Sequence, residues 1–195
     1  RLGGRKVLVV IPDGEQRVEA FLRSAFGGRM ELSIVRVPNR PGATPIQSLA
    51  SALEVMAQGG TGCRSALVSY GDIHYDLDHF EPSTEPDVFT SDYIDSDKYS
   101  SIHRTREGYL FEEAWAGNKC KWDHRHCTGD CHTDIGLYYL PSVAEVQQIL
   151  RNGVAASTVG GLLFHLYGSS LSLQEVVTWT DLGHLDTSTR IRTHV

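Results

Sequence analysis

The first seventy residues alternate between short β-branched runs and stretches with helical spacing of apolar residues, and this alternation constrains the fold most. The run KVLVVI at residues 6–11 ends at a Pro-Asp-Gly turn, which is typical of a central strand buried on both faces. Further strands are expected at residues 31–37 and 66–70, and helices at residues 18–25 and 49–56. This order is that of right-handed βαβ crossovers. We therefore expect an α/β fold with three layers, α/β/α, around a mostly parallel central sheet.

The middle of the chain has a different pattern, with aromatic and β-branched residues in short runs. Residues 87–95 and 101–115 predict strands, and an Arg-Glu-Gly sequence within the second run predicts a tight turn. A further short strand is expected at residues 135–140. Neither a linker nor an internal repeat interrupts the sequence. We expect one domain, residues 1–195, with a small β-rich insert.

Composition narrows the class of protein. Of the 195 residues, 41% are hydrophobic and 22% charged, and the formal net charge is −6. These values exclude intrinsic disorder and leave no basic surface for tracking a nucleic-acid backbone. The longest apolar run is far shorter than the roughly 20 residues that span a bilayer, and no signal segment opens the sequence. We expect a cytoplasmic protein without a nucleic-acid or membrane partner, and leave open whether it forms a homo-oligomer.

Two aspartates, far apart in the sequence, each lie where a strand pattern meets a glycine. Gly71-Asp72 comes directly after the third expected strand, and Asp181 stands between Trp179 and Gly183. Ligands of open parallel sheets bind beyond the carboxyl ends of the strands. Magnesium takes one or two protein carboxylates and completes its shell with water and phosphate oxygens. The pair Asp72 and Asp181 therefore predicts a Mg²⁺ site, while the alternative for Asp72 is a capping role in a turn or helix.

In this order the motifs resemble those of the sugar-1-phosphate nucleotidyltransferases, also called NDP-sugar pyrophosphorylases, which have a GT-A-like fold. The family's central strand ends in Gly-Asp, as here at Gly71-Asp72, and its later Trp-x-Asp-x-Gly segment is matched by residues 179–183. Between them, an acidic strand and a glycine-aromatic strand of the family resemble residues 108–113 and 134–139. The likeness covers nearly the whole chain and rests on short motifs in the right order.

The resemblance implies nucleotidyl transfer between two small molecules. A sugar-1-phosphate oxygen would attack the α-phosphorus of a nucleoside triphosphate, giving an NDP-sugar and pyrophosphate, with Mg²⁺ held by Asp72 and Asp181. Such chemistry asks the protein mainly for positioning and charge neutralisation. The substrate-binding residues that the resemblance implies are Arg40, Gly42, Thr44, Ser48, Gly71, Glu113 and Gly136. Thr44 and Ser48 are also ordinary residues at a helix start, which is the alternative for them.

The sequence departs from the family pattern at two places. The family begins with a strand and a glycine-rich loop that ends in Arg-Leu and cradles the triphosphate, whereas residues 1–4 pass directly into the run at residues 6–11. The lysine that commonly follows the family's middle-strand glutamate is replaced, since Ala114 follows Glu113. We expect a domain that lacks the first strand and its loop. Two alternative functions stay open: a glycosyltransferase that uses an NDP-sugar donor, and a non-catalytic regulatory subunit that binds nucleotide-sugars.

Residues 116–133 form an insert rich in cysteine and histidine, which favours a structural zinc site. Zinc takes four thiolate or imidazole ligands, and its binding orders short loops that have no core of their own. The candidate ligands are Cys120, Cys127, Cys131 and one histidine, His132 or else His124 or His126. The C-x6-C-x3-C spacing leaves two alternatives open, a disulfide such as Cys120–Cys127 or Cys127–Cys131, and free thiols.

Overall fold

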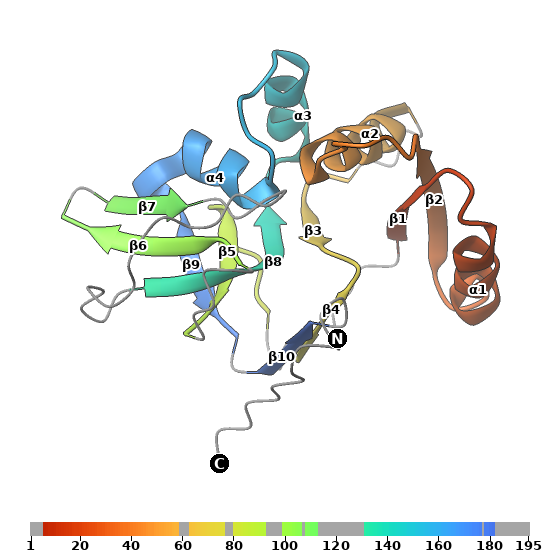
Figure 1. Ribbon diagram of the computed structural model, residues 1–195, viewed down its shortest axis with the longest axis horizontal. Coiled ribbons are helices and arrows are strands. Elements are labelled where there is room, and N and C mark those ends of the chain that lie inside the picture. Colours follow the sequence, from red (N-terminus) through yellow and green to blue (C-terminus); the bar gives the residue numbers. More distant parts are fainter. Residues whose placement is uncertain are drawn as a thin grey trace.

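The computed structural model describes residues 6–58, 63–76, 80–92, 99–106, 108–112, 131–176 and 178–181 (Figure 1). Its helices are α1 (Gln16–Phe26), α2 (Pro45–Gln58), α3 (Val143–Arg151), α4 (Val159–Tyr167) and the short 3-10 helix η2 (Gly168–Ser170). None of these helices is long and apolar enough to cross a membrane. The strands are β1 (Lys6–Pro12), β2 (Glu31–Val37), β3 (Ala66–Ser69), β4 (Ile73–Asp76), β5 (Asp87–Ser91), β6 (Ser101–Thr105), β7 (Gly108–Glu112), β8 (Cys131–Leu140), β9 (Ser172–Glu175) and β10 (Thr178–Asp181).

The largest sheet is mixed, with the strand order β7-β6-β8-β5-β9 and with β3 also paired to β8. The long strand β8 runs antiparallel to β3, β5 and β6, whereas β5 and β9 run parallel. The expectation of a mostly parallel sheet is therefore wrong. A local pattern indicates which residues form a strand, but whether two strands run parallel depends on which distant strand each one pairs with. Here β3 pairs with β8 rather than with another strand of a βαβ unit.

The first βαβ unit forms as predicted but lies apart from the large sheet (Figure 1). β1 and β2 pair in parallel over their full lengths, and α1 connects them. The prediction that β1 is a central strand is wrong, because among the described strands it pairs only with β2, and Ile11 is the single buried residue of its seven. α1 has no buried residue, and Phe21 on its surface is 65% exposed.

β8 is the central strand of the large sheet and divides the core into two parts. On one face, Tyr138 and Leu140 pack with apolar residues of α2, α3 and α4, which form a helical layer. On the other face, Ile135, Leu137 and Tyr139 pack beneath the antiparallel pair β4–β10. Successive side chains of a strand point to opposite faces, so a continuous apolar run is what a strand buried on both faces requires. The central strand therefore comes from late in the chain.

Two expectations for the middle of the chain are confirmed with changed bounds. β6 and β7 pair antiparallel with Thr105 opposite Gly108, which is the pairing expected on either side of a tight turn at this place. The strand expected at residues 135–140 is longer, since β8 begins at Cys131. This extension places the last residues of the predicted cysteine- and histidine-rich insert in the central strand.

Candidate active site

Asp72 lies in the short turn between β3 and β4. β3 ends at Ser69, Tyr70 follows, and Gly71 and Asp72 form the turn into β4. Gly71 and Asp72 are both exposed. Asp72 is therefore at the carboxyl end of a strand, on a surface that a ligand can reach.

Asp181 comes next to this turn through the pairing of β10 with β4. The two strands are antiparallel, and their register places Asp181 opposite Ile73, the residue that follows Asp72. Opposed residues of an antiparallel pair have Cα atoms about 4.5–5.5 Å apart. The backbones of Asp72 and Asp181 are therefore neighbours at one end of the β4–β10 pair, although the two residues are far apart in the sequence.

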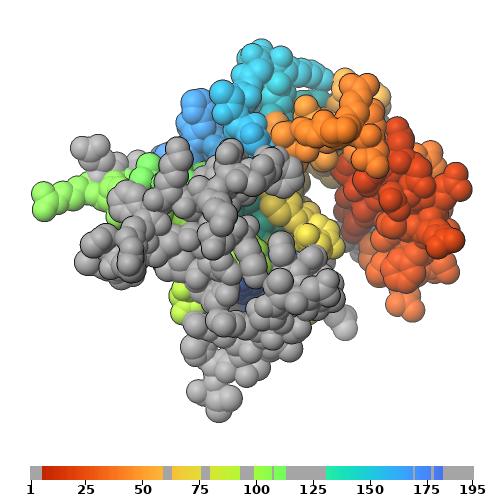
Figure 2. Space-filling view, in the orientation of Figure 1, coloured from red at the N-terminus to blue at the C-terminus, as the bar shows by residue number. Residues whose placement is uncertain are grey.

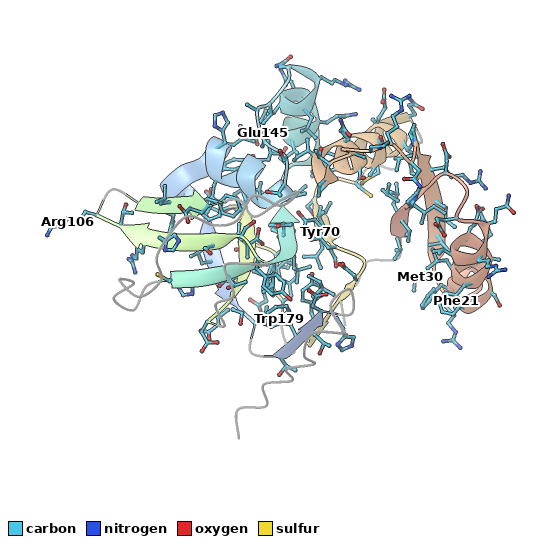
Figure 3. All side chains as sticks on the ribbon, viewed as in Figure 1. Phe21, Met30, Tyr70, Arg106, Glu145 and Trp179 are labelled. Carbon is cyan, nitrogen blue, oxygen red and sulfur yellow. The ribbon has the colours of Figure 1, made fainter. Side chains whose placement is uncertain are left out.

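A tyrosine from outside the strand pair contacts the Asp181 carboxylate. The hydroxyl of Tyr99 donates a hydrogen bond of 2.6 Å to Oδ2 of Asp181. The ring of Tyr99 packs edge-on against Trp179, with 5.3 Å between ring centroids, and Trp179 lies on β10 (Figure 3). Tyr99 could not be identified from the sequence, because no local pattern marks a residue that meets β10 only through the tertiary fold.

The donor atoms at this site suit a hard divalent cation. Asp72 and Asp181 supply carboxylate oxygens, and Mg²⁺ usually takes only one or two protein carboxylates. Within the described ranges, no group of three or more His, Cys, Asp or Glu residues is placed to hold a metal ion. Two carboxylates are the number that Mg²⁺ takes when water and substrate oxygens complete its shell, and binding of Mg²⁺ by Asp72 and Asp181 stays a prediction.

Gly136 of β8 contacts the segment that leads to Asp72. Its φ is +74°, and a Cβ at this position would lie 2.4 Å from Cδ2 of Tyr70. Its carbonyl accepts hydrogen bonds from the backbone N–H of Tyr70 at 3.0 Å and from the hydroxyl of Tyr75 at 3.1 Å. Burial is the main cause that raises the pKa of Tyr75, and the charges of Asp134 and Asp72 add to it. Glycine is required here because it permits both the positive φ and the close approach of the Tyr70 ring.

The buried carboxylate of Asp134 holds Gly136 from the core side. Oδ1 accepts a hydrogen bond of 3.0 Å from the Gly136 N–H, and Oδ2 accepts one of 2.7 Å from the Tyr138 hydroxyl. A Cβ on Gly160, in the first turn of α4, would lie 2.4 Å from Oδ2, so the carboxylate sits where a helix N-terminus favours negative charge. Burial, and then the charge of Asp134, raise the pKa of Tyr138 well above its usual value. The sequence signal that could have identified Asp134 is its position as an acidic residue at the start of an apolar run.

The predicted nucleotide-binding residues lie in the loop before α2 and at its start. Arg40 and Gly42 are exposed, whereas Thr44 and Ser48 are half-buried. The carbonyl of Thr44 accepts a hydrogen bond of 3.3 Å from the backbone N–H of Ser48. These contacts are those of a helix start, and binding of a nucleotide by these residues stays a prediction. Glu113 lies outside the described residues.

The predicted zinc ligands are described only in part. Cys131 and His132 begin β8, whereas Cys120 and Cys127 lie outside the described residues. Cys131 is disulfide-bonded, and its Sγ lies 3.2 Å from Nδ1 of His103. A sulfur in a disulfide is not a thiolate, so coordination of zinc by Cys131 requires the reduced protein. Zinc binding stays a prediction.

The arrangement of helices and strands is similar to that of nucleoside-diphosphate-sugar pyrophosphorylases. The structure of the enzyme from Vibrio cholerae RC9 has a TM-score of 0.67 and 13% identity, over 93% of this chain and 78% of that chain. UDP-glucose pyrophosphorylase complexed with UDP-glucose has a TM-score of 0.61 and 14% identity, over 93% and 77%. HddC from Yersinia pseudotuberculosis complexed with GMP-PN has a TM-score of 0.59 and 11% identity, over 94% and 76%.

These likenesses establish the class of fold. The described part of the chain has a mixed α/β fold similar to that of these pyrophosphorylases, so the expected likeness to the family is confirmed for the fold alone. The sequence matches no protein-family model and no curated protein.

Proposed function

We propose that the protein is a Mg²⁺-dependent nucleotidyltransferase that joins a nucleoside triphosphate to a sugar-1-phosphate or a similar phosphate ester. The observation that carries this proposal is the β4–β10 register, which places Asp181 opposite Ile73, the residue after Asp72, within a pyrophosphorylase-like fold. The bound molecules of two neighbours, GMP-PN in HddC and UDP-glucose in UDP-glucose pyrophosphorylase, support nucleotides and nucleotide-sugars as ligands.

In the proposed reaction, a phosphate oxygen of the sugar-1-phosphate forms a bond to the α-phosphorus of the triphosphate. The bond from that phosphorus to the α–β bridging oxygen breaks, and pyrophosphate leaves with the electron pair. A bound Mg²⁺ supplies charge neutralisation for phosphates that would otherwise repel each other. Asp72 and Asp181 would hold this ion beside the exposed turn. Because the sugar-1-phosphate attacks the α-phosphorus directly, the chain needs no covalent nucleophile.

The remaining predicted residues have separate tasks in this proposal. Arg40 carries a guanidinium that pairs with phosphate, and Thr44 and Ser48 supply hydroxyls for the nucleotide. Gly71 keeps the turn beside Asp72 free of a side chain. We infer that Gly136 acts indirectly, because the Tyr70 ring fills the space that a side chain at 136 would need. Glu113 is proposed to contact the sugar.

The exposure of β1 supports the expected place of a further strand. Four of its apolar residues, 7 to 10, are only half-buried. In the face shown in Figure 2, a hollow separates β3 (yellow) from the β1–β2 lobe (red) beneath α2. A strand beside β1 would cover these residues, and in the family that the sequence resembles such a strand carries the glycine-rich loop. We propose that tight triphosphate binding needs this strand and loop.

The test is release of pyrophosphate from a panel of nucleoside triphosphates and sugar-1-phosphates. We expect release that requires both substrates and Mg²⁺, and that falls by about 100-fold or more in Asp72→Asn and in Asp181→Asn, since each removes charge stabilisation from the transition state. Glu54→Gln is the matched control, because Glu54 is an exposed carboxylate on α2.

Two other outcomes would contradict the proposal. Sugar transfer or donor hydrolysis from an NDP-sugar, without pyrophosphate exchange, would indicate a glycosyltransferase. Saturable nucleotide binding without turnover, unaffected by Asp72→Asn, would indicate a regulatory subunit.

A further inference from the structure

We propose that Tyr99 is a positioning residue, which fixes the carboxylate of Asp181 in the orientation that binds the divalent cation. This inference rests on the proposed function, because it assigns a role toward the same site. It starts from the hydrogen bond of 2.6 Å between the Tyr99 hydroxyl and Oδ2 of Asp181.

Tyr99 and Asp181 come from different parts of the fold. Asp181 ends β10, which pairs with β4, whereas Tyr99 lies two residues before β6 of the large sheet. The residue between, Ser100, is buried, and its carbonyl accepts a hydrogen bond of 2.9 Å from the backbone N–H of Asp134 in the central strand. The phenol is therefore carried on backbone that is attached to the core of the large sheet.

The orientation of the Tyr99 ring is also fixed. It packs edge-on against Trp179, two residues before Asp181 on β10. Residues i and i+2 of a strand point to the same face, so Tyr99 meets Trp179 with its ring and Asp181 with its hydroxyl. The ring contact sets where the hydroxyl lies, and the hydroxyl in turn sets where one carboxylate oxygen lies.

The chemistry of the contact suits a second layer around a metal ligand. Hydrogen bonds from a hydroxyl to a carboxylate are charge-assisted and stronger than neutral ones, with lengths of about 2.5–2.7 Å. Carboxylates that bind metal ions are themselves held by such outer partners, and loss of the partner weakens metal affinity by about 10- to 100-fold. Tyr99 meets this description for Asp181, whereas Asp72 lies on an exposed turn.

The experiment measures binding of Mn²⁺, as a spectroscopic substitute for Mg²⁺, by electron paramagnetic resonance in the absence of substrates. The proteins are the wild type, Tyr99→Phe, Asp181→Asn and Tyr109→Phe. Tyr99→Phe keeps the ring against Trp179 and removes only the hydroxyl. Tyr109→Phe is the matched control, because the half-buried Tyr109 packs its ring against Phe164, with 6.3 Å between centroids, away from β10.

We expect Tyr99→Phe to raise the dissociation constant for Mn²⁺ by about 10- to 100-fold, with the same number of ions bound at saturation. Asp181→Asn should abolish the binding, and Tyr109→Phe should leave it unchanged. The melting temperature separates positioning from folding, since a purely structural role for Tyr99 would lower it without changing the affinity of the folded protein.

The outcomes separate this inference from the proposed function. If the wild type binds Mn²⁺ and Asp181→Asn does not, but Tyr99→Phe binds as the wild type does, the metal site stands and the role of Tyr99 is overturned. If the wild type binds no Mn²⁺, or Asp181→Asn binds it equally well, the proposed metal site fails and the role of Tyr99 fails with it.

Discussion

The hydroxyl of Tyr138 lies 2.7 Å from a carboxylate oxygen of Asp134, four residues earlier on the same strand. Both residues are buried, and the other oxygen of Asp134 holds the N–H of Gly136. Through Gly136, this pair is connected to Tyr70 and so to the turn that carries Asp72. The core under the large sheet and the proposed metal site are therefore one continuous set of contacts.

Tyr138→Phe should destabilise the protein by about 1–3 kcal/mol, because it leaves a buried carboxylate oxygen without this donor. The free energy of unfolding from urea titration measures the change. Tyr109→Phe, which makes the same chemical change at a half-buried site, should stay within about 0.5 kcal/mol of the wild type. Equal stabilities for both variants would show that the Tyr138 contact with Asp134 contributes nothing.

Gly136→Ala should cost more stability than Gly153→Ala, although both glycines have a positive φ. At Gly153 a Cβ meets no atom within 4 Å, so the cost is only that of the backbone conformation, about 1–2 kcal/mol. At Gly136 the Cβ meets the Tyr70 ring, which adds about 1–3 kcal/mol of overpacking. Urea unfolding of the two variants gives the comparison, and a cost at Gly136 no larger than at Gly153 would contradict it.

The ion pairs of Glu19 should stabilise the protein at neutral pH, and this contribution should be lost in acid. Hydrogen bonds from Arg23, and then from Arg36, lower the pKa of Glu19. A group with a lowered pKa contributes stability above its unfolded pKa of about 4.3, and the contribution is lost as the pH falls through the folded pKa. Glu19→Gln should therefore lose stability at pH 6 and little at pH 3, measured by urea unfolding at both values. A loss that is equal at the two pH values would contradict this assignment.

Local patterns predicted individual elements well. β2 has the predicted bounds, α2 contains the predicted helical stretch, and β6 pairs with β7 on either side of the expected turn. Local patterns did not predict which strands pair. β1 has the apolar sequence of a central strand but pairs only with β2 among the described strands, and β3 runs antiparallel to β8. Sequence spacing does not record which distant strand a given strand meets.

The same difference applies to the site. Asp72 and Asp181 could be chosen as candidates because each stands at a strand-to-glycine junction, which is a local signal, and their role as metal ligands stays a prediction. Tyr99 could not, since its contact with Asp181 depends on how β6 and β10 are placed in the fold. Asp134 carried a weak local signal, a charge in an apolar strand, but its partners Gly136 and Gly160 become evident only from the packing of α4 on β8.

The most direct measurement of the central claim is the stoichiometry and affinity of Mg²⁺ binding by isothermal titration calorimetry. Asp72→Asn, Asp181→Asn and the control Glu54→Gln are compared with the wild type. If the two aspartates hold one ion together, the wild type and Glu54→Gln bind a single ion per chain, and each aspartate variant alone loses that binding. An ion that remains bound with unchanged affinity in either aspartate variant would contradict a shared site.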